Sequence, residues 1–105
     1  MGCWMAKAHP LLLEIASQLR ELAGDADTEW SFSIHADEEM IEDHLEYPDA
    51  VYVIQHCKII NGEFEDDCWR CVVKGKTTDG IWVRIPVRFS LDERYIEIIS
   101  GWKIA

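Results

Sequence analysis

A predicted strand in the last third of this chain carries side chains of the types that bind phosphate and nucleobases. The alternating run 81–89 places Trp82, Arg84 and Arg88 on one face, and Lys74 belongs to a neighbouring predicted strand. Cationic side chains bind the phosphates of RNA, and an indole ring offers a surface on which a base stacks. The pattern favours an RNA-binding face, although an ordinary solvated sheet face has the same alternation.

Four histidines are candidates for acid–base chemistry, because imidazole exchanges a proton near neutral pH. They are His9, His35, His44 and His56. A helical metal site would place two histidines three or four residues apart, whereas His35 and His44 are nine residues apart. We therefore expect no metal site, and no cofactor.

The four cysteines include one Cys-x-x-Cys motif, formed by Cys68 and Cys71; the others are Cys3 and Cys57. Structural zinc usually needs a second such pair, and redox use needs a helix N-terminus after the motif. On a strand, positions three apart point to opposite faces, so the two sulfurs do not share a ligand. We expect reduced thiols, with Cys71 packed in the core.

The sequence shows neither a run of about 18 apolar residues, as a membrane span requires, nor a secretory leader. Without a secretory signal, a disulfide framework has no oxidising compartment in which to form. The expected location is therefore the cytoplasm.

Charge is distributed unevenly along the 105 residues, which carry 20 acidic and 10 basic side chains and a formal net charge of −10. A net negative charge opposes general attraction to nucleic acid. However, residues 1–57 hold 12 acidic and 2 basic side chains, whereas residues 58–105 hold 8 of each. The acidic excess thus belongs to the predicted helices, and a cationic sheet face is compatible with it.

The elements that would position these groups begin with helices. Apolar residues at helical spacing predict a helix over 9–23, and Gly24 is a natural stop after it. Ser33 is the expected N-cap of a second helix, which would run through Leu45 and end before Pro48. The segment 49–57 fits either a strand or one face of a helix by periodicity alone.

Period-two alternation replaces this pattern from Lys58 onward, with turn signals at Asn61-Gly62, Asp66-Asp67 and Asp79-Gly80. Strands that follow one another in this way predict an antiparallel meander. The expected fold is α+β, a single domain over residues 1–105, in which N-terminal helices pack on a curved antiparallel sheet of about four strands.

Taken together, these residues resemble a family of small toxin-like proteins of unknown function, whose signature is Ser/Thr-x-His-Ala-x-x-Arg-Met. The resemblance extends from about Ser31 to Ile104, and it is carried by Phe32-Ser33-Ile34-His35-Ala36, Met40, Asp49-Ala50-Val51-Tyr52-Val53-Ile54, Lys58-Ile59-Ile60, Val73-Lys74-Gly75-Lys76 and Asp79-Gly80. It implies the fold of RelE-like and BrnT-like ribonuclease toxins. It also implies a helix over 49–57, and a toxin-like core over 29–105 preceded by a helix and linker over 1–28.

The function that this resemblance implies is that of a toxin from a type II toxin–antitoxin pair. Such a toxin is a metal-independent RNA endonuclease that a cognate antitoxin protein neutralises. The partners would be that antitoxin and RNA, and a homodimer is left open. His35 matches the signature histidine, and His44 is its expected partner in acid–base catalysis. Ser100 and Trp102 match a hydroxyl residue and an aromatic residue two apart near the C-terminus, while Lys74, Arg84 and Arg88 would supply the cations.

The sequence departs from the resembled family at two arginine positions, which are occupied by Glu39 and Asp43. RNA cleavage without a metal needs positive charge at the phosphate, so these acids leave open a degenerate relative. The alternative function is a non-catalytic protein-binding module that uses an acidic helical face. That face consists of Asp37, Glu38, Glu39, Glu42 and Asp43.

Overall fold

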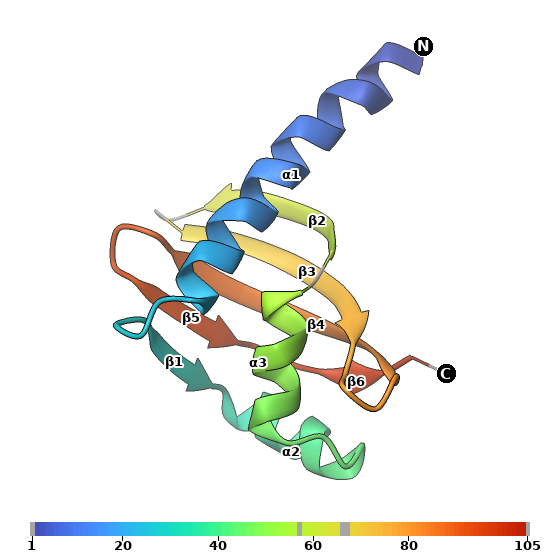
Figure 1. Cartoon of the computed structure of the whole chain (residues 1–105), viewed down its shortest axis with the longest axis vertical. Helices are drawn as coiled ribbons and strands as arrows, with labels where there is room; N and C mark the ends of the chain where they lie inside the picture. Colours follow the sequence, from blue (N-terminus) through green and yellow to red (C-terminus); the bar gives the residue numbers. More distant parts are fainter. Residues whose placement is uncertain (1, 57, 66–67, 105) are drawn as a thin grey trace.

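The computed structural model describes residues 2–56, 58–65 and 68–104 (Figure 1). Within these residues the fold is α+β, as predicted, with three helices and one six-stranded sheet. The helices are α1 (Gly2–Ala23), α2 (Ile34–Glu42) and α3 (Tyr47–Gln55). The strands are β1 (Glu29–Phe32), β2 (Lys58–Glu65), β3 (Cys68–Lys76), β4 (Trp82–Ser90), β5 (Tyr95–Ile98) and β6 (Trp102–Lys103).

The sheet is mixed, in contrast to the predicted antiparallel sheet of about four strands. Its order is β1-β5-β4-β3-β2, and β6 pairs with β4 beyond the end of β5. All pairs are antiparallel except β1 with β5, where Trp30 lies opposite Ile96 and Phe32 opposite Ile98. The sequence did not reveal β1, because four residues are too few to establish a strand period.

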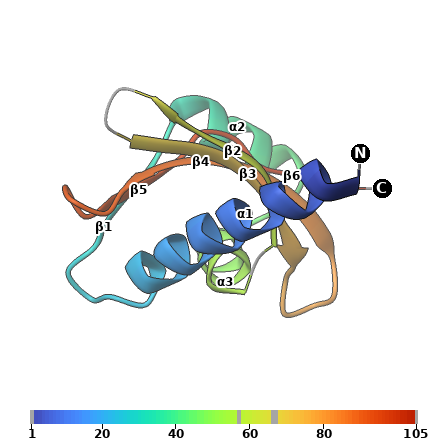
Figure 2. The same ribbon diagram turned by 90° about the horizontal axis from the view of Figure 1, so that it is seen from above.

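Helices α1 and α3 lie on the same side of the sheet (Figure 2). The core forms between them and the sheet, and its large side chains are fully buried. They include Ile15, Leu19 and Leu22 of α1, Val53 and Ile54 of α3, Val73 of β3, Val83, Ile85, Val87 and Phe89 of β4, and Ile96 and Ile98 of β5. Along the strands, the residues that alternate with these buried side chains lie on the opposite face of the sheet.

Helix α1 confirms the predicted first helix and its stop. Its last turn closes with a hydrogen bond from the amide of Gly24 to the carbonyl of Arg20 at 3.0 Å. The helix begins at Gly2, well before the predicted start at residue 9, and its first turns project beyond the sheet (Figure 1). No helix in the described part of the chain is both long and apolar enough to span a membrane.

The turn predicted at Asn61-Gly62 is wrong, because β2 pairs with β3 on both sides of these residues. A β-bulge between Ile59 and Asn61 is the only shift in register along this described pair of strands. A Cβ atom at Gly62 would lie 3.0 Å from Cδ1 of Ile15 on α1. Gly62 therefore allows α1 to pack closely on β2. The turn predicted at Asp66-Asp67 lies outside the described residues, and the Asp79-Gly80 turn is confirmed, with Gly80 at φ +81°.

Helix α2 begins as predicted and ends earlier than predicted. The Ser33 hydroxyl accepts a hydrogen bond from the amide of Ala36 at 3.0 Å, which is the N-cap interaction. At the other end the amides of His44 and Leu45 donate to the carbonyls of Ile41 and Met40, at 3.1 and 2.8 Å. This Schellman arrangement places His44 at φ 56°, a left-handed conformation that stops the helix.

Helix α3 settles the ambiguous segment in favour of a helix. Pro48 lies in its first turn, where a missing amide proton costs no intrahelical hydrogen bond. The Asp49 carboxylate accepts a hydrogen bond from the amide of Glu46 at 3.0 Å and so satisfies a group at the helix start. Periodicity alone did not decide between the two structures, whereas this local chemistry favours the helix.

Candidate nucleic-acid interface

The five residues predicted to bind RNA lie on one face of β3, β4 and β6, opposite α1 and α3. Lys74 of β3 is paired with Arg84 of β4, and Arg84 is paired with Trp102 of β6. Residues directly opposite one another on neighbouring strands place their side chains on the same face. Lys74, Arg84 and Trp102 thus form a row across three strands, which we call the cationic row.

Trp102 joins this row only because the last predicted strand is interrupted. Strict alternation from Ile96 would have placed Trp102 on the buried face with Ile98. Instead, β5 ends at Ile98 and pairing with β4 resumes at Trp102, which changes the phase of the alternation. The interruption lies at Gly101, where a Cβ atom would be 3.6 Å from Met40 of α2.

Trp82 lies next to the cationic row and is bracketed by two lysines. The Nζ atoms of Lys74 and Lys76 lie 5.4 and 5.2 Å from the centre of its ring, within the range of cation–π attraction. The indole is 43 % exposed, so part of its surface remains accessible to a ligand. Lys76 was not predicted as a site residue. The signal was present in the sequence, because the Asp79-Gly80 turn places Lys76 opposite Trp82.

The arginines of this face differ in their surroundings. The Nε atom of Arg84 is buried and has no hydrogen-bond partner within the described residues. Arg88 pairs with Glu97 of β5 at 3.4 Å, which offsets part of its charge. Between them the face is hollowed into a shallow groove of about 400 Å³, whose lining includes Arg70, Val72, Pro86 and Ile99. Of these two arginines, Arg84 has no measured carboxylate partner among the described residues, so its charge is not offset in the way that Glu97 offsets that of Arg88.

The predicted catalytic residues His35 and Ser100 both contact Glu39. The Nε2 atom of His35 forms an ion pair with Glu39, and the Ser100 hydroxyl donates a hydrogen bond to Oε1 of Glu39 at 2.6 Å. Ser100 is only 6 % exposed, whereas His35 lies on the surface. In this arrangement Ser100 connects α2 to the segment between β5 and β6, and Glu39 orients the imidazole of His35.

His44, the predicted partner of His35, lies just beyond the opposite end of α2. The two histidines are nine residues apart, or about 13 Å along a helix axis at 1.5 Å per residue. No measured contact joins the two imidazoles among the described residues, and their pairing in acid–base catalysis stays a prediction.

The predicted acidic face of α2 is largely occupied by contacts within the chain. Asp37 accepts a hydrogen bond from the Tyr47 hydroxyl at 2.6 Å, and this bond raises the pKa of Tyr47 above its ordinary value. Asp43 accepts a hydrogen bond from the backbone amide of Lys103 at 2.7 Å. With Glu39 bound to Ser100, three of the five acids hold α2 to its neighbours. Glu38 and Glu42 are exposed to solvent.

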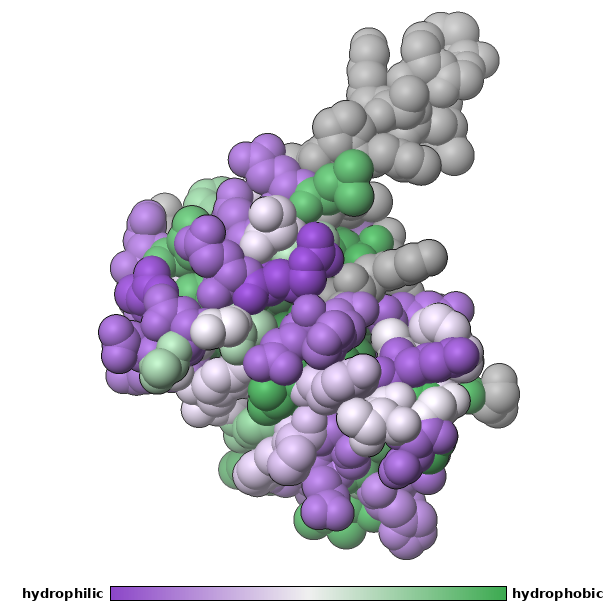
Figure 3. Space-filling view, in the orientation of Figure 1, coloured by the Kyte–Doolittle hydropathy of each residue, from purple (hydrophilic) through white to green (hydrophobic). Residues whose placement is uncertain are grey.

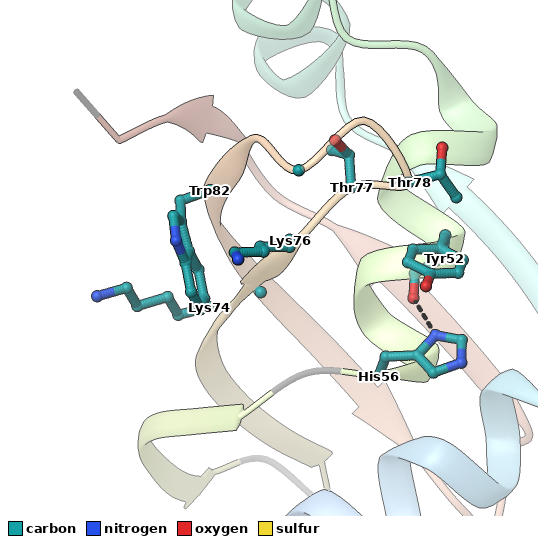
Figure 4. A pocket seen from close by; sticks show the side chains of 9 residues that line it. Tyr52, His56, Lys74, Lys76, Thr77, Thr78 and Trp82 are labelled. Carbon is teal, nitrogen blue, oxygen red and sulfur yellow. Dashed lines mark hydrogen bonds between the residues drawn. The ribbon is translucent and has the colours of Figure 1, made fainter.

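A second groove, of about 460 Å³, adjoins the cationic row at Lys74 and was missed by the sequence analysis. Its lining includes Tyr52 and His56 of α3 together with Lys74, Lys76 and Trp82 (Figure 4). No sequence signal connected these elements, because His56 fell in the ambiguous segment and lies far from the hairpin in sequence. Only the packing of α3 near the β3–β4 hairpin brings them together.

The cysteines are placed as a strand predicts. Cys71 is buried in the core and Cys68 is buried as well. Burial raises the pKa of Tyr95, and the side-chain hydrogen bond between Tyr95 and Cys68 raises this pKa further. The Cys3 side chain and Cys57 lie outside the described residues. Among the side chains that the structure describes, no three His, Cys, Asp or Glu residues gather as a metal site would require.

Comparison with known proteins identifies a family without assigning an activity. No curated protein and no solved structure matches the chain significantly. The model of a family described as a domain of unknown function (DUF4258) matches residues 32–100. This match runs from the last residue of β1 to the segment before β6 and leaves α1 outside. Because it spans well over half of the sequence, the chain belongs to the DUF4258 family.

Proposed function

We propose that this protein binds single-stranded RNA on the open face of its sheet and acts as the ribonuclease toxin of a type II toxin–antitoxin pair. The observation that carries the proposal is the cationic row of Lys74, Arg84 and Trp102, with Trp82 beside it. Two indoles and two cations on adjoining strands match the two chemical features of a nucleic-acid strand, its stacked bases and its phosphates.

The geometry favours a single strand over a duplex as the ligand. Trp82 and Arg84 are two residues apart on β4, which separates them by about 7 Å along the strand. An indole can stack only on a base that is unpaired or splayed out, and the bases of an RNA duplex are not accessible in this way.

The charge distribution also supports RNA binding at the cationic row. Asp37, Glu39 and Asp43 accept hydrogen bonds from the Tyr47 hydroxyl, the Ser100 hydroxyl and the Lys103 amide. A net charge of −10 therefore coexists with a local cationic face. Cleavage, as distinct from binding, is proposed from the resemblance of the sequence motifs between Ser31 and Ile104 to those of a toxin-like family.

Binding is tested by the fluorescence anisotropy of a labelled single-stranded RNA in titrations at several salt concentrations. Trp82→Ala is expected to weaken binding about 10-fold, because stacking on an aromatic side chain contributes about 1–3 kcal/mol per base. Arg84→Gln is expected to weaken binding and to reduce the slope of log K against log salt by about 0.7, the value for one lost phosphate contact.

The matched control is Arg20→Gln, which removes one positive charge from the exposed surface of α1. It should leave the affinity and the salt slope close to those of the wild type. Equal losses in Arg20→Gln and Arg84→Gln would show that binding follows only net charge, and would contradict the proposed surface. The toxin function is tested by expression in bacteria: arrest should require Arg84, and normal growth with soluble wild-type protein would contradict it.

A second candidate function, docking of a protein partner on α2, is favoured by two exposed isoleucines. Ile34 is 80 % and Ile41 72 % exposed, and Glu38 and Glu42 lie on the same outward side of the helix. Large apolar side chains at this exposure are typical of an interaction site when they cluster. The space-filling view also shows hydrophobic patches at the α2 end of a largely hydrophilic face (Figure 3).

The partner that this surface suits is a protein segment with apolar and basic side chains, such as an antitoxin encoded alongside the chain. Co-purification with that protein should be lost in the double variant Ile34→Ser and Ile41→Ser. The control is Trp82→Ala, which should retain the partner because Trp82 lies on the sheet. If Trp82→Ala lost the partner and the double variant retained it, the partner would bind the sheet instead of α2.

A further inference from the structure

The groove of about 460 Å³ beside the β3–β4 hairpin contains acid–base and cationic groups that RNA binding alone does not use. One wall is the last turns of α3, with Tyr52 and His56, and the other is the β3–β4 hairpin, from which the exposed Thr78 lies toward Tyr52 (Figure 4). The side chains of Lys74, Lys76 and Trp82 lie on the side of the hairpin away from His56. The groove therefore places an imidazole across the hairpin from the surface proposed for RNA.

The imidazole of His56 is held in one tautomer. Its Nδ1 atom lies 2.9 Å from the carbonyl oxygen of Tyr52, as the dashed line in Figure 4 shows. A carbonyl oxygen only accepts hydrogen bonds, so Nδ1 carries the proton and donates it. In the neutral ring Nε2 then has a lone pair and can accept a proton. The residue is exposed, so Nε2 is accessible to a ligand.

The ring is also fixed in position by its neighbour. The Tyr52 ring packs against it with centroids 4.3 Å apart and planes inclined by 32°. A base whose tautomer and orientation are both set by the protein is the arrangement that proton transfer requires. By contrast, Nε2 of His35 is already engaged by the Glu39 carboxylate.

We propose that His56 is the general base of RNA cleavage and that this groove is the cleavage site, an inference that rests on the proposed function. His56 Nε2 takes the proton of a ribose 2′-hydroxyl, and the oxygen so formed bonds to the adjacent phosphorus. The bond from phosphorus to the 5′ oxygen breaks, and that oxygen takes a proton from water, while protonated His56 returns its proton to solvent. The products are a 2′,3′-cyclic phosphate and a 5′-hydroxyl.

The cations of the hairpin would hold the RNA strand beside this step. The Lys76 ammonium group lies over the Trp82 ring, on the side of the hairpin away from His56 (Figure 4). Lys76 and Trp82 would therefore bind nucleotides next to the scissile bond, and not the phosphate that is cleaved. The RNA strand would thus run from the cationic row over the end of β3 toward His56.

The test measures cleavage of a labelled single-stranded RNA by wild-type protein, His56→Gln, His35→Gln and His9→Gln. Cyclic phosphate ends are detected by mass spectrometry, and binding is measured separately on a 2′-deoxy analogue that cannot be cleaved. His56→Gln is expected to lower the cleavage rate about 100-fold or more, as loss of a general base does, while the affinity for the analogue changes less than about threefold. His9→Gln, in α1, is the control and should cleave normally.

A structural effect of the substitution is separated by chemical rescue. Added imidazole should partly restore cleavage to His56→Ala, and a misfolded variant would not respond. Cleavage by His56→Gln at the wild-type rate, or loss in His35→Gln alone, would overturn the role of His56 while RNA binding still supports the proposed function. Wild-type protein that binds the analogue without cleaving RNA would overturn the inference and the ribonuclease part of the proposed function, and would leave RNA binding in place. Absence of any binding by the wild type would overturn the proposed function itself.

Discussion

Replacing Glu39 with arginine is expected to lower the free energy of unfolding by about 2–3 kcal/mol, the scale of a lost hydrogen bond to a charged group. The Ser100 hydroxyl is nearly inaccessible to solvent and donates to Glu39 Oε1 at 2.6 Å. Arginine has no acceptor atom, so the buried hydroxyl would lose its partner. Urea denaturation followed by tryptophan fluorescence measures the change.

The matched control is Glu38→Arg, one residue earlier on the same helix. It makes the same change in charge at an exposed position, and its expected effect lies within about 0.5 kcal/mol of zero. Glu39→Gln keeps an acceptor oxygen and should lie between the two. Equal destabilisation by Glu38→Arg and Glu39→Arg would mean that only the charge matters, and would contradict a specific role for the Ser100 contact.

This prediction gives a physical meaning to two acids that appeared, in sequence, to replace arginines of a resembled family. His35, Glu39 and Asp43 follow one another at intervals of four along α2, so they lie on one side of the helix. Glu39 contacts Ser100, and Asp43 contacts the Lys103 amide. These two acids hold α2 against the segment from β5 to β6, which is also the segment that sets the position of Trp102.

Replacing Gly62 with valine is expected to destabilise the fold by about 1–3 kcal/mol, the usual cost of adding bulk to a well-packed core. A Cβ atom at this position would lie 3.0 Å from Cδ1 of Ile15 and 3.4 Å from Cβ of Cys71. Ile15 is completely buried, so its side chain must be displaced within the core. Thermal and urea unfolding of the variant measure the effect.

Asn61→Val is the control for this substitution, since it introduces the same side chain at the neighbouring, exposed position of β2. It should change stability by no more than about 0.5 kcal/mol. Shortening Ile15 to alanine in the Gly62→Val background should cost less than in the wild type, because the smaller residue removes the clash. Additive effects of the two substitutions would contradict the contact, and so would tolerance of valine at position 62.

Much of the fold was predictable where a local pattern is strong. The apolar stripe of α1, the Ser33 cap and the Asp79-Gly80 turn all matched the structure. The alternation in β4 also placed Trp82, Arg84 and Arg88 on one face correctly. Each of these features depends on residues close together in sequence, whose spacing follows directly from helix or strand geometry.

The wrong predictions concern features that depend on contacts beyond the local sequence pattern. Asn61-Gly62 has the composition of a hairpin turn, yet the glycine lies against Ile15 of a helix nearly fifty residues earlier in the chain. Strand β1 is stabilised by its parallel pairing with β5 rather than by its own pattern. The end of α2 is set by Leu45 and His44 hydrogen bonds to the preceding turn, although apolar spacing continued past them.

The sequence by itself determined that the chain is α+β, that its acidic excess lies within residues 1–57, and that β4 presents cations and an indole on one face. Local backbone geometry and composition are sufficient for these properties. Only the tertiary structure decided that Trp102 completes a row with Lys74 and Arg84, that Glu39 is committed to Ser100, and that His56 shares a groove with Lys76. These relations depend on contacts between distant segments, and such contacts leave no periodic trace in the sequence.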